Sequence, residues 1–178
     1  TKYENAKIVL TKDLEDNFKA LVEGAVLGDY KFTKYKSEKN DKKVELNIFV
    51  EKISKELEEI LKEAKIIAKA VNKARDMVNT PPADFYPKVM AKKAKKIAQD
   101  LELDIRVEGE KFLEENGMNA MLSVGRASVH ESQLIHLTYK PTEAKKKIVL
   151  VGKGLTYDSG GLSLKPADFM VTMKADKS

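Results

Sequence analysis

Two lysines and two aspartates stand near the end of the sequence, where Lys153, Asp158, Lys165 and Asp176 surround a glycine-rich stretch. Two carboxylates brought together attract hard divalent cations, because their charge offsets part of the cost of removing the ion from water. A lysine can join such a ligand set only as the neutral amine, which a nearby dication favours by repelling the protonated form. The spacing alone also fits an exposed ion pair between Lys153 and Asp158. Both interpretations are open at this point.

The element expected to position these side chains is the apolar run of residues 148–151, which comes directly before them. The run is rich in β-branched residues and apolar on both alternations, so it predicts a strand buried on both faces. Ligands of α/β proteins usually bind beyond the carboxyl ends of such strands. Gly160 and Gly161 then allow the chain to turn sharply after Asp158.

Residues 151–178 read VGKGLTYDSGGLSLKPADFMVTMKADKS. The segments VGKG, TYDSGG, SLKP and MKAD stand in the order and spacing typical of the leucyl (cytosol) aminopeptidase family of dinuclear metallopeptidases, and the chain resembles that family. Every fixed position of the pattern is present. Weaker similarity extends upstream through residues 23–36, 74–82, 124–128 and 134–137, so the resemblance covers nearly the whole chain.

The resemblance implies a role for five residues. In relatives, the residues that match Lys153, Asp158 and Asp176 are metal ligands, and the first aspartate bridges two ions. Lys165 matches a catalytic lysine that polarises the substrate carbonyl and stabilises the oxyanion. Lys153 and Asp158 are also expected to contact the substrate, and Met173 matches a position near the side-chain pocket. The expected ions are zinc or manganese, with magnesium as a further option, and a bicarbonate ion is expected as a general base in the complete enzyme.

The activity implied by the resemblance is two-metal hydrolysis that releases amino-terminal residues, with a leucine-type preference, from peptides. Expected partners are peptides with a free amino terminus and further copies of the chain, because family members are cytoplasmic homohexamers. The alternative is a non-catalytic binding or assembly module that retains the fold. The chain begins at Thr1 and ends at Ser178, before the family's second ligand motif. We therefore interpret it as an internal portion of a longer enzyme, and expect it to be inactive and unstable alone.

Composition limits the other classes of function. With 42% hydrophobic and 34% charged residues, the 178-residue chain is typical of a soluble globular protein. No apolar run approaches the roughly 18 residues of a membrane-spanning helix. The absence of cysteine excludes disulfides and thiolate metal ligands. The net charge of +5 comes from lysines spread along the chain, without the arginine-rich cluster or aromatic set that would indicate nucleic-acid binding.

Two other patterns do not indicate a site. His130 and His136 lack the helical spacing of a zinc-binding pair, so neither is expected to be a metal ligand, and a structural role is expected for His136. Lys153 lies between two glycines, but a phosphate-binding loop also requires a glycine six residues before the lysine and a hydroxyl residue after it. Those positions hold Lys147 and Gly154.

Residues 1–79 are expected to be the carboxyl-terminal portion of an amino-terminal α/β domain with a long linking helix. Residues 44–50 alternate with period two and predict a strand. From Ile53, apolar residues recur in steps of three and four, which places them on one face of a helix. A coiled coil is the competing interpretation. The predicted stripe is Ile53, Leu57, Ile60, Ala64, Ile67, Val71, Ala74 and Val78.

Residues 80–178 are expected to be the first portion of an α/β catalytic domain with a mixed sheet flanked by helices. Pro81 and Pro82 cannot continue the preceding helix and mark the boundary. Pro87 suits the first turn of a second helix. The predicted buried face of that helix is Met90, Ala94, Ile97 and Leu101. Strands are predicted at residues 103–107, 133–139 and 147–151, with a helix at 110–115 that ends at Asn116 and Gly117.

Overall fold

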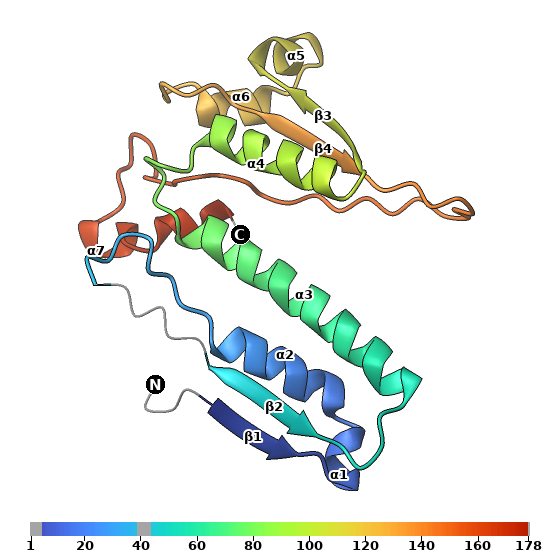
Figure 1. Cartoon of the computed structure of the whole chain (residues 1–178). Coiled ribbons are helices and arrows are strands. Elements are labelled where there is room, and N and C mark those ends of the chain that lie inside the picture. The colour runs from blue at the N-terminus through green and yellow to red at the C-terminus, as the bar shows by residue number, and fades with distance from the viewer. Residues whose placement is uncertain (1–4, 39–43, 178) are drawn as a thin grey trace. The chain divides into compact units, whose positions relative to one another are not determined.

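The computed structural model describes residues 5–38 and 44–177, which belong to two compact units, Thr1–Asp76 and Met77–Ser178 (Figure 1). Both units contain helices and a small sheet, so the predicted α/β class is confirmed. The assignment of residues 1–79 and 80–178 to an amino-terminal and a catalytic domain stays a prediction.

The first unit contains a two-stranded parallel sheet, in which β1 (Asn5–Val9) pairs with β2 (Glu45–Phe49). Between the strands the chain forms α1 (Lys12–Glu15) and α2 (Phe18–Gly28). The long helix α3 (Lys55–Asn79) follows β2. The predicted strand and long helix are thus confirmed, whereas β1, α1 and α2 were not predicted.

The core of the first unit lies where α2 and α3 pack against β2. Its buried residues are Leu10, Phe18, Val22 and Ala64. Partly buried side chains packed against them are Leu21, Ile48, Val50, Leu57, Ile60 and Leu61. Each large apolar side chain removed from water contributes about 1.5–3 kcal/mol. A cavity of about 740 Å³ with a mostly apolar lining lies between α2, β2 and α3.

The apolar stripe predicted along α3 meets the core only in the amino-terminal half of the helix, and Ile53, its first predicted member, lies before α3 and is 71% exposed. Leu57 packs against the core and Ala64 is completely buried. Farther along, Ile67 and Val71 are 38% and 37% exposed, and Ala68 is buried instead. In this half of the helix the buried face therefore includes Ala68 and leaves the larger apolar residues Ile67 and Val71 partly exposed.

Polar contacts explain why α3 keeps this face toward α2. The Asn72 side-chain amide donates to the carbonyl oxygen of Val26 at 3.2 Å, and the Arg75 guanidinium donates to that of Leu27 at 2.9 Å. Both carbonyls lie in the last turn of α2, where they have no partner within the helix. Because Asn72 and Arg75 donate hydrogen bonds to these carbonyls, they lie against α2 in place of Val71.

The second unit contains a two-stranded antiparallel sheet formed by β3 and β4, with helices before, between and after the strands. Its elements are α4 (Pro87–Asp100), β3 (Asp104–Glu108), α5 (Glu110–Glu115), α6 (Asn119–Gly125), β4 (Leu134–Thr138), α7 (Ala167–Met170) and the 3-10 helix η1 (Met173–Lys177). The predicted helix from Pro87, the two strands and the helix at 110–115 are confirmed. The helix α6 was not predicted.

The buried face of α4 is formed by alanines. Ala91, Ala94 and Ala98 are buried, whereas Leu101, predicted to be buried, is 63% exposed. Leu101 lies after the last helical residue, where its backbone has left helical geometry. The turn after α5 follows the prediction, because Gly117 has a φ of +66°, a conformation that glycine adopts without strain.

The strand predicted at residues 147–151 is not formed, and its predicted burial is wrong. Ile148, Val149, Leu150 and Val151 are 84%, 68%, 92% and 93% exposed. A strand requires a neighbour for its backbone donors and acceptors. Among the described residues no strand pairs with this segment, because β3 and β4 pair only with each other. The apolar run therefore stays extended and unpaired.

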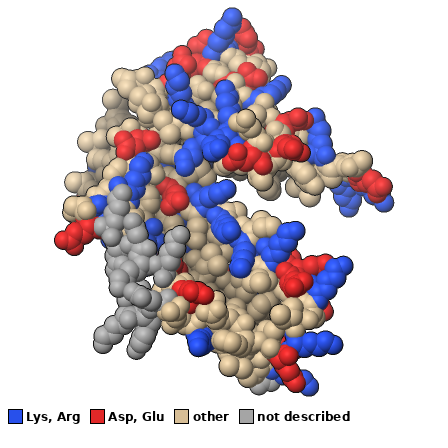
Figure 2. Space-filling view, in the orientation of Figure 1, with Lys and Arg blue, Asp and Glu red and all other residues tan. Residues whose placement is uncertain are grey.

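Charged side chains of both signs are interspersed on the face of the molecule shown in Figure 2. On α4, for example, Lys96 Nζ lies 3.4 Å from a carboxylate oxygen of Asp100, one turn away. Exposed pairs of this kind contribute little to stability. Within the ranges that the structure describes, no helix has the length and apolar character needed to cross a membrane.

Candidate metal and catalytic site

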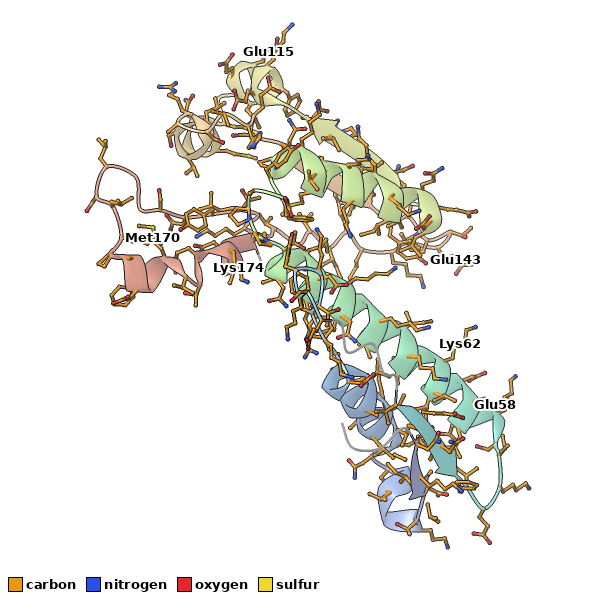
Figure 3. The ribbon with its side chains drawn as sticks, turned by 60° about the vertical axis from the view of Figure 1, so that its left-hand side comes forward. Glu58, Lys62, Glu115, Glu143, Met170 and Lys174 are labelled. Carbon is orange, nitrogen blue, oxygen red and sulfur yellow. The ribbon has the colours of Figure 1, made fainter. Side chains whose placement is uncertain are left out.

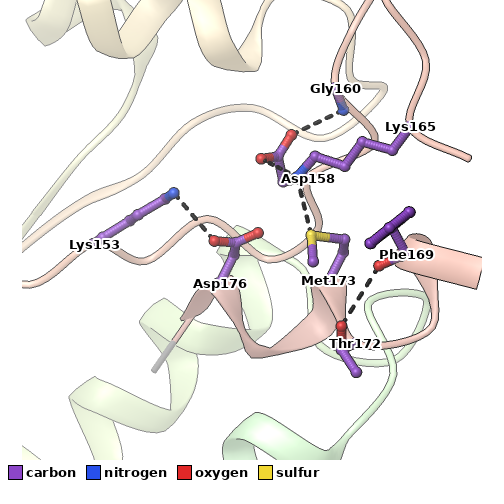
Figure 4. Close-up of polar contacts among 8 residues, drawn as sticks. All are labelled: Lys153, Asp158, Gly160, Lys165, Phe169, Thr172, Met173 and Asp176. Carbon is purple, nitrogen blue, oxygen red and sulfur yellow. Dashed lines mark hydrogen bonds and ion pairs between the residues drawn. The ribbon is translucent and has the colours of Figure 1, made fainter.

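The glycine-rich turn after Asp158 folds back on itself. The backbone N–H of Gly160 donates to Asp158 Oδ1 at 2.9 Å, and the N–H of Lys165 donates to the carbonyl oxygen of Ser159 at 2.9 Å (Figure 4). Gly160 has a φ of +91°, and a Cβ placed there would lie 2.5 Å from the backbone oxygen of Ser163. Only glycine fits this position, and the closed turn returns Lys165 to Asp158.

Lys165 and Asp158 form the first of two lysine–aspartate pairs. Lys165 Nζ donates to Asp158 Oδ2 at 2.6 Å and lies 3.0 Å from the sulfur of Met173. The hydrogen bond from Lys165, followed by that from the Gly160 backbone, lowers the pKa of Asp158 below its ordinary value. Asp158 is therefore a carboxylate at neutral pH and able to bind a cation.

Lys153 and Asp176 form the second pair. Lys153 Nζ lies 3.1 Å from Asp176 Oδ1 (Figure 4). The other oxygen, Asp176 Oδ2, is buried and has no hydrogen-bond partner in the part of the chain that the structure describes. A buried carboxylate oxygen without a partner is costly, and a bound cation would satisfy it. This oxygen is the feature of the structure that fits a metal site most directly.

Lys174 and Lys177, the two basic residues of η1, contact the backbone at the end of α3 and directly after it. Lys174 Nζ donates to the carbonyl oxygen of Asn79 at 3.4 Å, and Lys177 Nζ donates to that of Thr80 at 2.7 Å. Figure 3 shows Lys174 on η1 near the end of α3. Burial, and then the charge of Lys174, lower the pKa of Lys177 below its ordinary value. Lys177 was not predicted from the sequence to be a site residue.

The structure brings the five predicted site residues into one region, drawn together in Figure 4: Lys153, Asp158, Lys165, Met173 and Asp176. Within the described ranges no group of three or more His, Cys, Asp or Glu residues could hold a metal ion. The donors present are two carboxylates and the amines beside them. They fit part of a divalent-ion site, and the individual roles of these residues stay predictions.

The two histidines lie at other contacts. His130 stacks on Tyr86, with ring centroids 3.9 Å apart and an angle of 9° between the planes. His136 Nδ1 lies 3.3 Å from a guanidinium nitrogen of Arg106, its cross-strand partner on β3. Neither contact involves the five predicted site residues.

Comparison with known proteins defines the class of protein to which this fold and site belong. Residues 72–178 match the family model described as the cytosol aminopeptidase family, catalytic domain. The chain therefore belongs to the cytosol aminopeptidase family. The match begins within α3 and includes the whole of the second unit.

Three curated relatives bear the name "Probable cytosol aminopeptidase". The protein of Wolinella succinogenes is 50% identical over 95% of this chain and 36% of its own length. The Helicobacter hepaticus protein is 47% identical over 99% of this chain and 38% of its own length. The Aquifex aeolicus protein is 49% identical over 90% of this chain and 32% of its own length. The chain thus spans about a third of the length of these relatives.

A solved structure, the bottromycin maturation enzyme BotP in complex with Mn, shares the fold. It superposes with a TM-score of 0.78 at 31% sequence identity, over 97% of this chain and 37% of that protein. The similarity extends over both units of the chain.

Proposed function

We propose that the whole protein is a metal-dependent aminopeptidase that releases amino-terminal residues from peptides by two-metal hydrolysis. The observation that carries the proposal is the arrangement of Asp158 and Asp176. Each carboxylate is paired with a lysine, and one oxygen of Asp176 is buried without a partner among the described residues. Membership of the cytosol aminopeptidase family and the names of the relatives support the same activity. Because the chain spans about a third of those relatives, the activity is assigned to the whole protein.

The residues proposed to hold the metal ions are Lys153, Asp158 and Asp176. Zinc, manganese and magnesium are the ions proposed for these oxygen and nitrogen donors, and the structural neighbour was solved in complex with Mn. Bound divalent ions would lower the pKa of a water molecule and polarise the substrate carbonyl. Lys153 is now paired with Asp176 as an ammonium, so it must lose its proton to become a ligand.

Lys165 is proposed to be the catalytic cation. Its Nζ lies 2.6 Å from Asp158 and 3.0 Å from Met173, so it stands between a proposed ligand and a proposed substrate-binding residue. An ammonium held at this point would donate a hydrogen bond to the substrate carbonyl oxygen, most strongly when that oxygen gains negative charge. Lys153 and Asp158 are proposed to contact the substrate as well, and Met173 to contact its side chain.

Membership of the family suggests several further properties of the whole protein. We expect a leucine-type preference, a bicarbonate ion in the active site, a cytoplasmic location and a homohexamer. The second unit is proposed to begin the catalytic domain, and the first to be the end of an amino-terminal domain. The alternative, a binding or assembly module, predicts no hydrolysis in the following experiment, with or without metal.

The proposal is tested by removing divalent ions from the whole protein. Hydrolysis of a leucine amide should disappear after dialysis against a chelator and return when manganese or zinc is added back. Far-UV circular dichroism before and after dialysis controls for unfolding. Unchanged hydrolysis in protein shown to be free of metal would contradict the two-metal mechanism. A folded, metal-loaded protein without activity toward any amino-terminal amide would favour the binding module.

A further inference from the structure

The segment that carries Asp176 and Met173 has almost no apolar anchor. In α7 no residue is buried, and Phe169 and Val171 are 67% and 76% exposed. In η1 the buried residue is Lys177, which is only 8% exposed. A segment that buries no large apolar side chain gains little from the hydrophobic effect, so other contacts must hold it in place.

Lys177 supplies such a contact. Its Nζ donates to the carbonyl oxygen of Thr80 at 2.7 Å, across 97 residues of sequence. The same nitrogen lies 5.7 Å from the centroid of the Phe85 ring, and Phe85 is 2% exposed. A short hydrogen bond and a cation–π contact thus hold one side chain at the base of the segment. All of these residues belong to the second unit.

The carbonyl oxygen of Thr80, which accepts the hydrogen bond from Lys177, lies at a point of the chain that favours a cation. The last carbonyl groups of a helix lack partners within the helix and carry partial negative charge. Asn79 is the last residue of α3, and Thr80 follows it. Lys174 Nζ and Lys177 Nζ donate to the carbonyl oxygens of these two residues, at 3.4 Å and 2.7 Å.

We propose that Lys177 is a positioning residue that holds Asp176 where a metal ion can bind it, an inference that rests on the proposed function. In a 3-10 helix successive side chains point about 120° apart, since there are three residues per turn. Lys177 can therefore face Thr80 while Asp176 faces Lys153. Loss of the anchor frees η1 and moves Asp176 away from its fixed position.

The test measures manganese affinity in the whole protein, with the metal removed and then titrated back. Lys177→Met removes the ammonium while keeping the length and apolar stem, and Lys177→Arg restores a cation. Replacement of a residue that orients a metal ligand typically weakens affinity about 10–100-fold. We expect a loss of about tenfold or more for the Met variant, and recovery to within about threefold of wild type for the Arg variant.

A matched control is Lys140→Met, which removes an ammonium that is paired with Asp104 at 2.6 Å and 74% exposed. Manganese affinity should not change in this variant. The melting temperature of each metal-free variant shows whether it folds. If Lys177→Met does not fold, Lys177→Gln, which keeps a donor without the charge, is judged by the same tenfold criterion.

Two results would overturn the inference: wild-type affinity in a folded variant without the cation, or an Arg variant as weak as the Met variant. Asp176→Asn separates this inference from the proposed function. If Asp176→Asn binds manganese as the wild type does, the proposed site itself is wrong and the inference falls with it. If Asp176→Asn loses affinity while Lys177→Met keeps it, only the role of Lys177 is wrong.

Discussion

Different forces stabilise the core of the first unit and the site segment, residues 153–177. In the core, α2 and α3 bury apolar side chains such as Phe18 and Val22 against β2. In the site segment, the best-defined contacts are the ion pairs of Asp158 and Asp176 and the lysines bound to backbone carbonyls. Apolar burial is insensitive to pH and ions, whereas an ion-paired site responds to both.

If residues 153–177 bind metal as proposed, the chain divides stability and function between these two regions. A carboxylate whose oxygens all accept hydrogen bonds from fixed donors would gain little free energy by binding a metal ion. Asp176 instead keeps one buried oxygen without a partner among the described residues. The two lysine pairs hold the carboxylates in place with cations that a dication can displace. Substitutions in the two regions should therefore have different consequences.

The largest expected effect is that of Asp158→Ala in the whole protein. Removing the proposed bridging carboxylate should lower both metal content and turnover, the latter by roughly a thousandfold or more, because metal catalysis supplies several kcal/mol. Elemental analysis and hydrolysis of a leucine amide measure the two quantities. Full metal content in this variant would show that Asp158 is not a ligand. The melting temperature of the metal-free protein should change little.

The next effect is that of Lys165→Met, which should separate catalysis from metal binding. Loss of one group that stabilises an oxyanion typically lowers kcat by about 10²–10³. Metal content should remain at the wild-type value, because Lys165 is proposed to act on the substrate. A variant that loses its metal would assign Lys165 to the ligand set instead. Lys140→Met, which removes an exposed lysine of the second unit, serves as the control.

A substitution in the core should produce the reverse pattern. Val22 is 3% exposed, so Val22→Ala should reduce the free energy of unfolding by about 2 kcal/mol through lost burial and the cavity left behind. Manganese affinity should be unchanged. Val129→Ala, at a residue that is 94% exposed, should cost less than about 0.5 kcal/mol. A large loss of metal affinity in Val22→Ala would contradict the separation of the two regions.

The smallest expected effect is on the pH dependence of the site segment. The pKa of Asp158 is lowered by Lys165 and then by the Gly160 backbone, so the stabilisation is present above the ordinary carboxyl pKa of about 4. It is lost as the pH falls through the lower pKa of the folded state. Carboxyl NMR titration of the metal-free protein should place Asp158 below its ordinary value, and Lys165→Met should raise it. An unchanged midpoint in that variant would contradict the assigned cause.

Local patterns in the sequence predict much of the secondary structure. The alternation before α3, the three-and-four spacing within it and Pro87 at the start of α4 each depend on a few neighbouring residues. The elements that were missed have weaker local signals. In α2, for example, apolar residues occupy most positions, so the segment from Phe18 has no clear periodicity.

Features that depend on distant partners could not be predicted in the same way. The run from Ile148 has the composition of a buried strand, but a strand forms only when another pairs with it. The motif predicts that Lys153, Asp158, Lys165 and Asp176 are site residues, yet spacing alone does not show which lysine pairs with which aspartate. The contact of Lys177 with Thr80 spans 97 residues and leaves no local pattern.

The central claim, that residues 153–176 hold divalent metal, is tested most directly by anomalous diffraction. Crystals of the whole protein soaked in manganese should show anomalous peaks in contact with Lys153 Nζ and the carboxylates of Asp158 and Asp176. Asp158 should lie between two peaks. The distance between Lys165 Nζ and Asp158 Oδ2 should differ from 2.6 Å. Manganese bound only elsewhere, with both lysine–aspartate pairs unchanged, would contradict the account.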